Sequence, residues 1–136
     1  MGLNYTAVDQ TVAVTSRRIS GGHCLVTEEN GTLTGTIVVH PTYTDNDCEY
    51  FTRKGVAAAH QFAVQPQLQG KGIGKALLAG AERWAKDHGF DELAMDTAEQ
   101  ARHLVELYGR LGYHPVGHVQ WPGKVYRSVV LSKQLL

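Results

Sequence analysis

The sequence predicts an α/β (α+β) domain in which helices pack on a mixed sheet. Three observations favour this class. Short runs rich in Val, Thr and aromatic residues are bounded by glycine, proline and asparagine, as strands are. Longer segments repeat apolar residues at helical spacing, and the two kinds of segment interleave along the chain. At 136 residues the chain has the size of one domain with a sizeable core, so we expect a single domain over residues 1–136.

The composition is that of an ordinary globular protein. Lys plus Arg and Asp plus Glu number 13 each, and hydrophobic residues make up 43% of the chain. This balance gives no reason to expect nucleic acid or membrane as a partner. No apolar run approaches the roughly 18 residues of a membrane span, and no leader resembles a signal peptide. Cys24 and Cys48 have no paired spacing, so we expect reduced thiols and a cytoplasmic location.

The first segment predicts a helix. Val8, Val12 and Ile19 fall near helical spacing, and the glycine pair at 21–22 ends the pattern. We therefore expect a helix from about Tyr5 to Ser20.

A hairpin and a third strand follow. The run "HCLVTEENGTLTGTIVVH" predicts a strand near 23–27, a turn at 30–31 and a second strand to about His40. Segment 41–55 has no periodicity and is long for a loop, which indicates a functional surface. The run "VAAAHQFAV" at 56–64 predicts a strand that ends before a proline.

The rest of the chain alternates helices and strands. A helix begins near Ile73 and ends at Gly89, with apolar residues on one face. "FDELAMDTA" predicts a strand, and 99–111 a second helix that stops at Gly112. "HPVGHVQ" and "VYRSVVLSK" predict two last strands around the turn "WPGK".

The most informative stretch is "QGKGIGK", in which Gly70, Gly72 and Gly74 alternate with larger residues. It does not match a Walker A loop or a dinucleotide-binding fingerprint, because the glycine spacing differs and no Ser or Thr follows Lys75. It could simply be a turn that starts a helix. Three glycines, however, carry an entropic cost that a plain turn avoids. Backbone N–H groups, a helix N-terminus and two lysines indicate a cradle for a pyrophosphate.

This stretch resembles the Gln/Arg-x-x-Gly-x-Gly/Ala signature of the GNAT family of N-acetyltransferases. "FAVQPQLQGKGIGKALL" is similar to the fourth strand, turn and third helix of that family, and "LYGRLGYHPV" to a later helix that carries a tyrosine. The resemblance extends from about Gly22 to the C-terminus. It implies a mixed, mostly antiparallel central sheet flanked by helices.

The resemblance also implies an activity and a co-substrate. Acetyl-CoA would be the donor, the acetyl group would pass directly to a primary amine of a small molecule or peptide, and no metal would take part. The pantetheine arm would pair with strand residues Phe62, Ala63 and Val64, which requires a splay or bulge beside Pro66. The coenzyme pyrophosphate would lie on the backbone amides of Gln69, Gly70, Lys71, Gly72, Ile73, Gly74 and Lys75.

Three residues are candidates for the chemistry. Tyr108 matches the family tyrosine that protonates the leaving thiolate, and a phenol suits that role. The alternative is a core tyrosine on an amphipathic helix. His60 is the candidate base for the acceptor ammonium, with a histidine satisfied inside the sheet as the alternative. Glu49 is the rival base.

The acceptor is not specified by the sequence. Segment 41–55 carries Asp45, Asp47 and Glu49 among aromatic residues, a set that suits a cationic amine but also a solvated loop. Trp121 and Tyr126 could line an acceptor pocket, form a dimer contact or belong to a turn. A homodimer fits the family, in which dimers are frequent.

The sequence departs from the family in two places. The usual first strand and first helix have no counterpart ahead of the hairpin, so we expect an N-terminally short domain. The asparagine that commonly lies seven residues before the tyrosine is replaced by Ala101. These departures keep a second function open, a non-catalytic acyl-CoA-binding module that has lost its acceptor chemistry.

Overall fold

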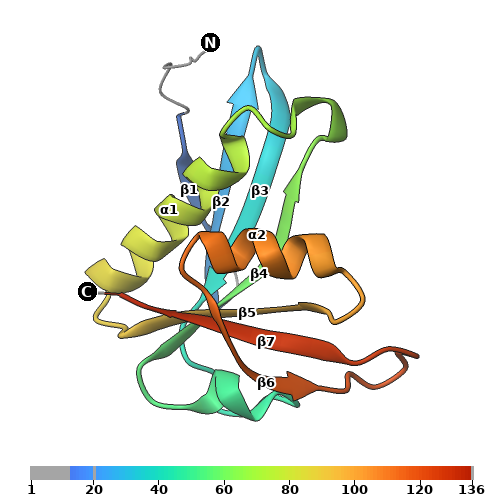
Figure 1. Cartoon of the computed structure of the whole chain (residues 1–136). Coiled ribbons are helices and arrows are strands. Elements are labelled where there is room, and N and C mark those ends of the chain that lie inside the picture. Colours follow the sequence, from blue (N-terminus) through green and yellow to red (C-terminus); the bar gives the residue numbers. More distant parts are fainter. Residues whose placement is uncertain (1–12, 20, 136) are drawn as a thin grey trace. The chain divides into compact units, whose positions relative to one another are not determined.

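The computed structural model describes residues 13–19 and 21–135 of the chain (Figure 1). In this part of the chain, seven strands form one open sheet in the order β1-β2-β3-β4-β5-β7-β6. The elements, in chain order, are β1 (Thr15–Ile19), β2 (Gly22–Glu29), β3 (Thr32–His40), the 3-10 helix η1 (Glu49–Thr52), β4 (Val56–Val64), the 3-10 helix η2 (Pro66–Leu68), α1 (Ile73–Asp87), β5 (Glu92–Ala98), α2 (Arg102–Arg110), β6 (His114–Val119) and β7 (Ser128–Gln134).

The strand directions confirm the predicted sheet. Antiparallel pairs join β1 to β2, β2 to β3, β5 to β7 and β6 to β7. One parallel pair joins β4 to β5. The sheet is therefore mixed and mostly antiparallel, as the family resemblance implies.

The chain divides into two compact units. The first comprises 1–39 and 59–84, and the second comprises 40–58 and 85–136. β4 and α1 each contribute residues to both units, because the boundaries fall at Ala58 and Trp84. A single domain over the whole chain stays a prediction.

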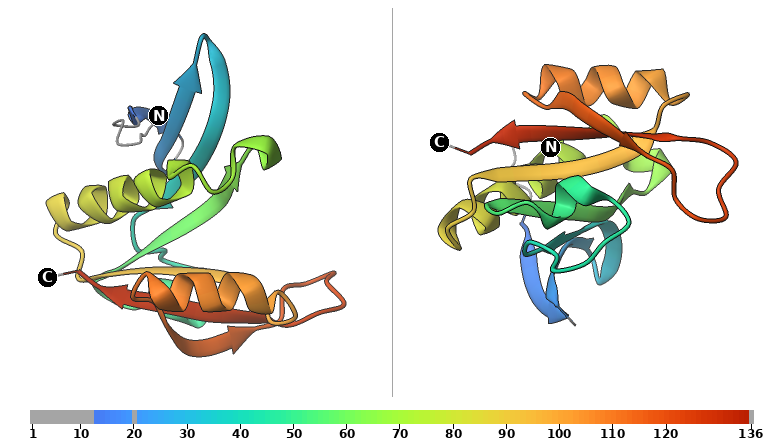
Figure 2. Two further views of the ribbon diagram at one scale, coloured as in Figure 1. Left: turned by 45° about the horizontal axis from the view of Figure 1, so that its top comes forward. Right: turned by 90° about the horizontal axis from the view of Figure 1, so that it is seen from below.

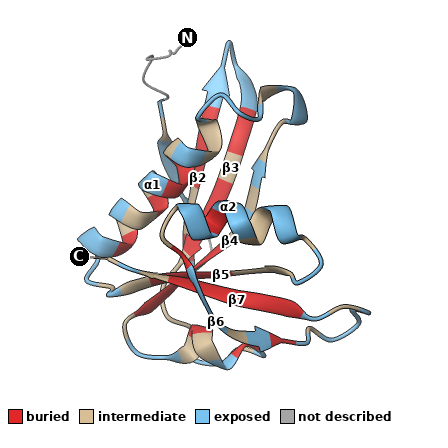
Figure 3. Ribbon diagram, in the orientation of Figure 1, coloured by how far each residue is buried: buried red, intermediate tan, exposed pale blue. Residues whose placement is uncertain are grey.

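The hairpin of the first unit has the predicted turn. Asn30 and Gly31 have φ of 54° and 80°, the left-handed conformation that both central residues of a type I′ turn require. On one face of this unit lies α1, whose residues Leu77, Leu78 and Ala81 are almost fully buried. Figure 3 shows this buried stripe along α1 and the exposed turn ahead of it. The amphipathic pattern therefore correctly predicts α1, and Gly89, at φ 86°, follows its end.

The predicted N-terminal helix is wrong where the structure tests it. Thr15–Ile19 forms strand β1, paired antiparallel with β2, and Gly21 at φ 80° lies in the turn that joins them. Val8 and Val12 lie outside the described residues. The helical spacing was misleading because the edge of β2 offers backbone hydrogen-bond partners, which apolar periodicity along the chain does not report. All five residues of β1 are exposed, so backbone pairing rather than core burial holds this strand.

The second unit builds its own core between β5, β7, β6 and segment 41–55. Its buried cluster comprises Cys48, Phe51, Val56, Ala58, Ala94, Val119 and Val130. α2 covers one face of the β5–β7 strands, as the two views of Figure 2 show. Several predicted boundaries shift. β5 begins at Glu92, α2 begins at Arg102 after a tight turn in which Ala101 N donates to Ala98 O, and β7 begins at Ser128.

The described part of the chain contains no helix that is both long and apolar enough to cross a membrane.

Candidate functional site

The glycine loop, residues 69–75, leaves open space above its backbone. Gly70 and Gly72 have φ of 86° and 85°, a left-handed conformation that glycine adopts without strain. A Cβ built at either position would meet no atom within 4 Å. The glycines are therefore required by the backbone conformation rather than by packing, and the space beside them can admit another group.

The third glycine of the run has a different role. A Cβ at Gly74 would lie 3.3 Å from Phe62 Cζ and 3.5 Å from Val64 Cγ2. The absence of a side chain thus lets the start of α1 approach the end of β4. In this way the structure brings the glycine loop together with Phe62 and Val64, the strand residues that the sequence predicts beside it.

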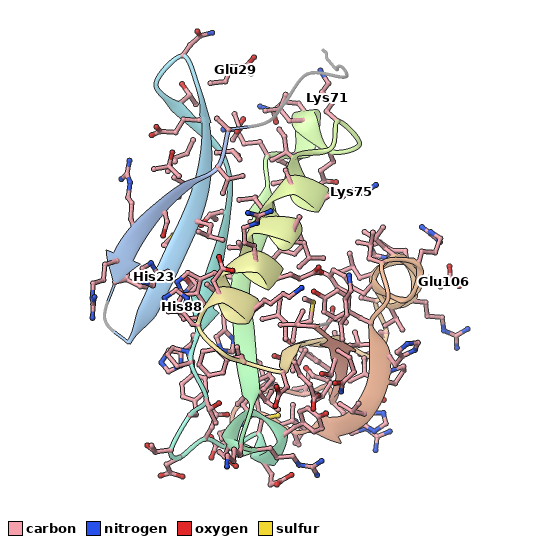
Figure 4. All side chains as sticks on the ribbon, turned by 90° about the vertical axis from the view of Figure 1, so that its left-hand side faces the viewer. His23, Glu29, Lys71, Lys75, His88 and Glu106 are labelled. Atoms are coloured by element: carbon pink, nitrogen blue, oxygen red, sulfur yellow. The ribbon has the colours of Figure 1, made fainter. Side chains whose placement is uncertain are left out.

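The start of α1 gives the loop a positive character. The first N–H groups of an α-helix have no acceptor within the helix and form the positive end of its dipole. Here the first helical bond at this end runs from Ala76 N to Gly72 O, at 3.0 Å. Lys71 and Lys75 are exposed and flank these groups at the same end of α1 (Figure 4). Together these features suit an anion such as a pyrophosphate.

Gln69 ties the loop to β4. Its side-chain Nε2 donates to Val64 O at 3.3 Å, and its backbone N donates to Pro66 O at the same distance. Gln69, the first residue of the signature, therefore stabilises the loop through hydrogen bonds to the residues just before it.

The backbone of β4 is irregular before its C-terminal end. Gln61 has φ of 51°, a left-handed conformation that is uncommon for a residue other than glycine. The parallel register with β5 covers Val56–Ala58. Gln61 lies five residues before Pro66, and the splay or bulge expected beside Pro66 stays a prediction. The sequence carries no signal for the left-handed Gln61, because glutamine, unlike asparagine, is not enriched in this conformation.

Tyr108 lies in α2, in the second unit, and is 7% exposed. Its ring meets Tyr113 edge-on, with centroids 6.3 Å apart. Burial raises the pKa of Tyr108 above its usual value, so the phenol is protonated at neutral pH. A protonated phenol fits a general acid, and a buried ring fits a core tyrosine, so both interpretations stay open.

The two candidate bases differ in their surroundings. His60 is half-buried in β4 and immediately precedes Gln61, in the first unit. Glu49 lies at the start of η1 in the second unit, is exposed, and accepts from Arg53 Nε at 3.1 and 3.2 Å. Arg53 thus occupies the Glu49 carboxylate, and the choice between His60 and Glu49 as the base stays a prediction.

The aromatic residues of segment 41–55 pack within their own unit. Phe51 is fully buried, and the Tyr43 ring stacks on His40 at 3.8 Å. Tyr50 donates to Glu92 Oε1.

Asp45 and Asp47 of the same segment are exposed. Segment 41–55 therefore buries Cys48 and Phe51 in the core of the second unit and keeps its acids at the surface.

Trp121 and Asp96 form a pair that the sequence did not predict. Trp121 packs against the buried cluster of the second unit, and its Nε1 donates to Asp96 Oδ2 at 2.7 Å. Tyr126 is half-buried close by in sequence. In the described residues, no group of three or more His, Cys, Asp or Glu side chains is arranged to hold a metal ion.

Comparison with known proteins decides the family. The model of the Acetyltransferase (GNAT) family matches residues 5–113. The chain belongs to the GNAT family. The S-(2-succino)cysteine N-acetyltransferase of Bacillus subtilis is 28% identical over 141 residues, which cover 99% of this chain and 80% of that protein.

Solved structures of GNAT proteins show the same fold. A GNAT family acetyltransferase from Elizabethkingia anophelis, solved with acetyl-CoA bound, has a TM-score of 0.73 at 14% identity, over 93% of this chain and 99% of that one. An IAA acetyltransferase from Bacillus cereus has a TM-score of 0.68 at 24% identity, over 85% and 79%. The predicted family and fold class are thus confirmed, and the chain is a member of an acyltransferase family.

Proposed function

We propose that this GNAT protein transfers an acetyl group from acetyl-CoA to a primary amine of a small molecule or peptide. One observation carries the proposal. Gly70 and Gly72 hold a left-handed backbone with open space beside them, at the positive end of α1. Such a loop offers several N–H groups to one anion without any side chain in the way. Acetyl-CoA carries such an anion, because its pyrophosphate is joined to the arm that bears the thioester.

The binding of the coenzyme would involve two neighbouring elements of the first unit. The loop N–H groups from Gln69 to Lys75 would hold the pyrophosphate, with Lys71 and Lys75 adding charge. Residues Phe62, Ala63 and Val64 would pair with the pantetheine arm as an added strand. The close contact of Gly74 with Phe62 and Val64 supports this arrangement, because it puts the strand end beside the loop.

The proposed chemistry is a direct transfer. The amine nitrogen forms a bond to the thioester carbonyl carbon, the carbon–sulfur bond breaks, and the electron pair leaves with sulfur. His60 would first take one proton from the acceptor ammonium, so that the neutral amine attacks, and Tyr108 would give its phenolic proton to the leaving thiolate. The second N–H proton, released as the amide forms, would pass to solvent, from which the Tyr108 phenolate would regain its own. The support for these roles is the sequence motif at Tyr108 and its protonated state, together with the position of His60 in β4 beside the proposed coenzyme strand.

The proposal is tested by turnover. Thiol release from acetyl-CoA would be followed over a panel of primary amines and short peptides, with Gly72→Glu as the variant that blocks the loop. Gly89→Glu is a matched control, since Gly89 has a φ of 86°, against 85° at Gly72, and equally open surroundings at the other end of α1. We expect turnover with at least one amine in the wild type and in the control, and none in Gly72→Glu.

Two results would contradict the enzymatic proposal. Saturable acetyl-CoA binding without turnover on any amine would favour the non-catalytic coenzyme-binding module. Equal turnover in Gly72→Glu and Gly89→Glu would remove the glycine loop from the donor site.

A further inference from the structure

Gly35 of β3 lies directly against the first turns of α1. A Cβ at this position would be 2.8 Å from Leu77 Cδ1 and 2.9 Å from Ile73 Cγ2, closer than real Cβ atoms approach other atoms. On the neighbouring strand, Thr27 Oγ1 would be 3.1 Å away. Since Ile73 is the first residue of α1, the missing side chain of Gly35 determines how closely the start of this helix approaches the sheet.

The other end of the glycine turn is attached to the same part of β3. Gln65 N donates to Thr34 O at 3.0 Å, and Gln65 Nε2 donates to Leu33 O at 2.5 Å. Gln65 O in turn accepts from Leu68 N at 2.9 Å, which begins η2. Two hydrogen bonds from Gln65, to Thr34 and to Leu33, thus fix the position of the chain where it leaves β4.

The middle of the turn has no such support from side chains. Gly70, Lys71 and Gly72 are exposed, and open space surrounds the Cβ positions of both glycines. The place and direction of the N–H groups in this stretch therefore depend on where its two ends are fixed. Both ends contact three consecutive residues of one strand, Leu33–Gly35, in addition to the contacts that Gln69 and Gly74 make with β4.

We propose that residues Leu33–Gly35 hold the glycine loop in place and thereby set its N–H groups in position for the coenzyme pyrophosphate. Gly35 and Gln65 are the positioning residues for this loop. The inference rests on the proposed binding of acetyl-CoA by this loop. Convergent N–H donors are effective only when they are held in place by the residues behind them. An added side chain at Gly35, or loss of the Gln65 hydrogen bonds, would move one end of the loop. The loop N–H groups would then no longer converge on one anion.

The first test is Gly35→Ala, compared with two controls in the same unit. Ile37→Val alters a fully buried residue of the same strand without adding atoms, and Gly80→Ala adds a Cβ to α1 at ordinary contact distance, 3.4 Å from Leu25 Cδ1. We expect Gly35→Ala to weaken acetyl-CoA binding about tenfold, the lower end of what supporting residues cost elsewhere. Its KM for acetyl-CoA should rise, while kcat and the KM for the amine stay near those of the controls.

A second variant keeps the proposal testable if Gly35→Ala folds poorly. Gln65→Met removes the donor to Leu33 O and keeps a side chain of similar length. Amide resonances of Gly70, Gly72 and Gly74 would be recorded by NMR without coenzyme. We expect them to shift in Gln65→Met and in Gly35→Ala, and to stay in place in Ile37→Val.

The outcomes separate this inference from the proposed function. Unshifted glycine resonances together with unchanged acetyl-CoA affinity in Gly35→Ala and Gln65→Met would overturn the positioning role of Leu33–Gly35. Shifted resonances with weakened binding would support it. A wild-type chain that binds no acetyl-CoA would refute the proposed function, and with it the coenzyme-positioning role assigned to Gly35 and Gln65.

Discussion

The sequence predicts a functional role for both the glycine loop and segment 41–55, but the two segments differ in how far the structure leaves them open to a ligand. The glycine loop keeps open space at Gly70 and Gly72. Segment 41–55 directs Phe51 into the core and pairs Glu49 with Arg53. A site made of backbone groups can be predicted from glycine spacing, because glycines impose a particular backbone. A site made of acids and aromatic rings cannot, because these side chains also satisfy one another.

The largest expected difference between the two segments is in stability. Phe51→Ala empties a fully buried position, and we expect it to lower the free energy of unfolding by about 3–5 kcal/mol. Leu33→Ala, at a residue 51% exposed, is the control and should cost far less. Denaturant-induced unfolding measures both. A cost below about 1 kcal/mol for Phe51→Ala would show that segment 41–55 is not part of the core.

The next effect is on turnover. Tyr108→Phe should lower kcat about 100-fold or more, as loss of a general acid does, with acetyl-CoA affinity unchanged. Tyr113→Phe is the matched control, because Tyr113 is the buried neighbour in ring contact with Tyr108. If the two variants are equally active, Tyr108 is a core tyrosine, and the acid must be sought elsewhere.

Ionisation of Tyr108 should also make the free energy of unfolding depend on pH. Burial raises the pKa of Tyr108 in the folded chain, so the folded state holds its proton more tightly than the unfolded state does. This contribution to stability is complete below the unfolded tyrosine pKa of about 10 and is lost as the pH rises above it. Urea unfolding across this range should show a smaller decline for Tyr108→Phe than for the wild type. Identical declines would mean that Tyr108 ionises equally in both states.

A smaller effect is expected at the irregular position of β4. Gln61→Gly should stabilise the chain by up to about 1 kcal/mol, because glycine adopts the φ of 51° without strain. Gln61→Ile, with a β-branched side chain, should destabilise it. Thermal unfolding of the two variants checks the sign. A stabilising Gln61→Ile would indicate that this residue adopts an ordinary strand conformation.

The smallest effect should come from Glu49→Gln. The pair with Arg53 is exposed, and exposed ion pairs contribute little to stability. We expect nearly unchanged unfolding and turnover, with Asp47→Asn as a control in the same segment. A large loss of turnover confined to Glu49→Gln would make Glu49 the base instead of His60.

Much of the fold follows from the sequence, and the exceptions have physical reasons. β4 has the predicted bounds, and α1 begins at the predicted Ile73, because a strand before a proline and an amphipathic stripe are strong local signals. β1 was missed because its pairing with β2 is a contact between segments, which periodicity does not report. The Trp121–Asp96 bond was missed for the same reason. The left-handed Gln61 was missed because glutamine is not enriched in that conformation.

Coenzyme binding by the glycine loop is tested most directly by calorimetric titration of acetyl-CoA into the wild type, Gly72→Glu and Gly89→Glu. We expect saturable binding to the wild type and to Gly89→Glu, and its loss in Gly72→Glu, because only that carboxylate enters the space beside the loop N–H groups. Equal binding by all three chains, or no binding by a folded wild type, would contradict coenzyme binding by this loop.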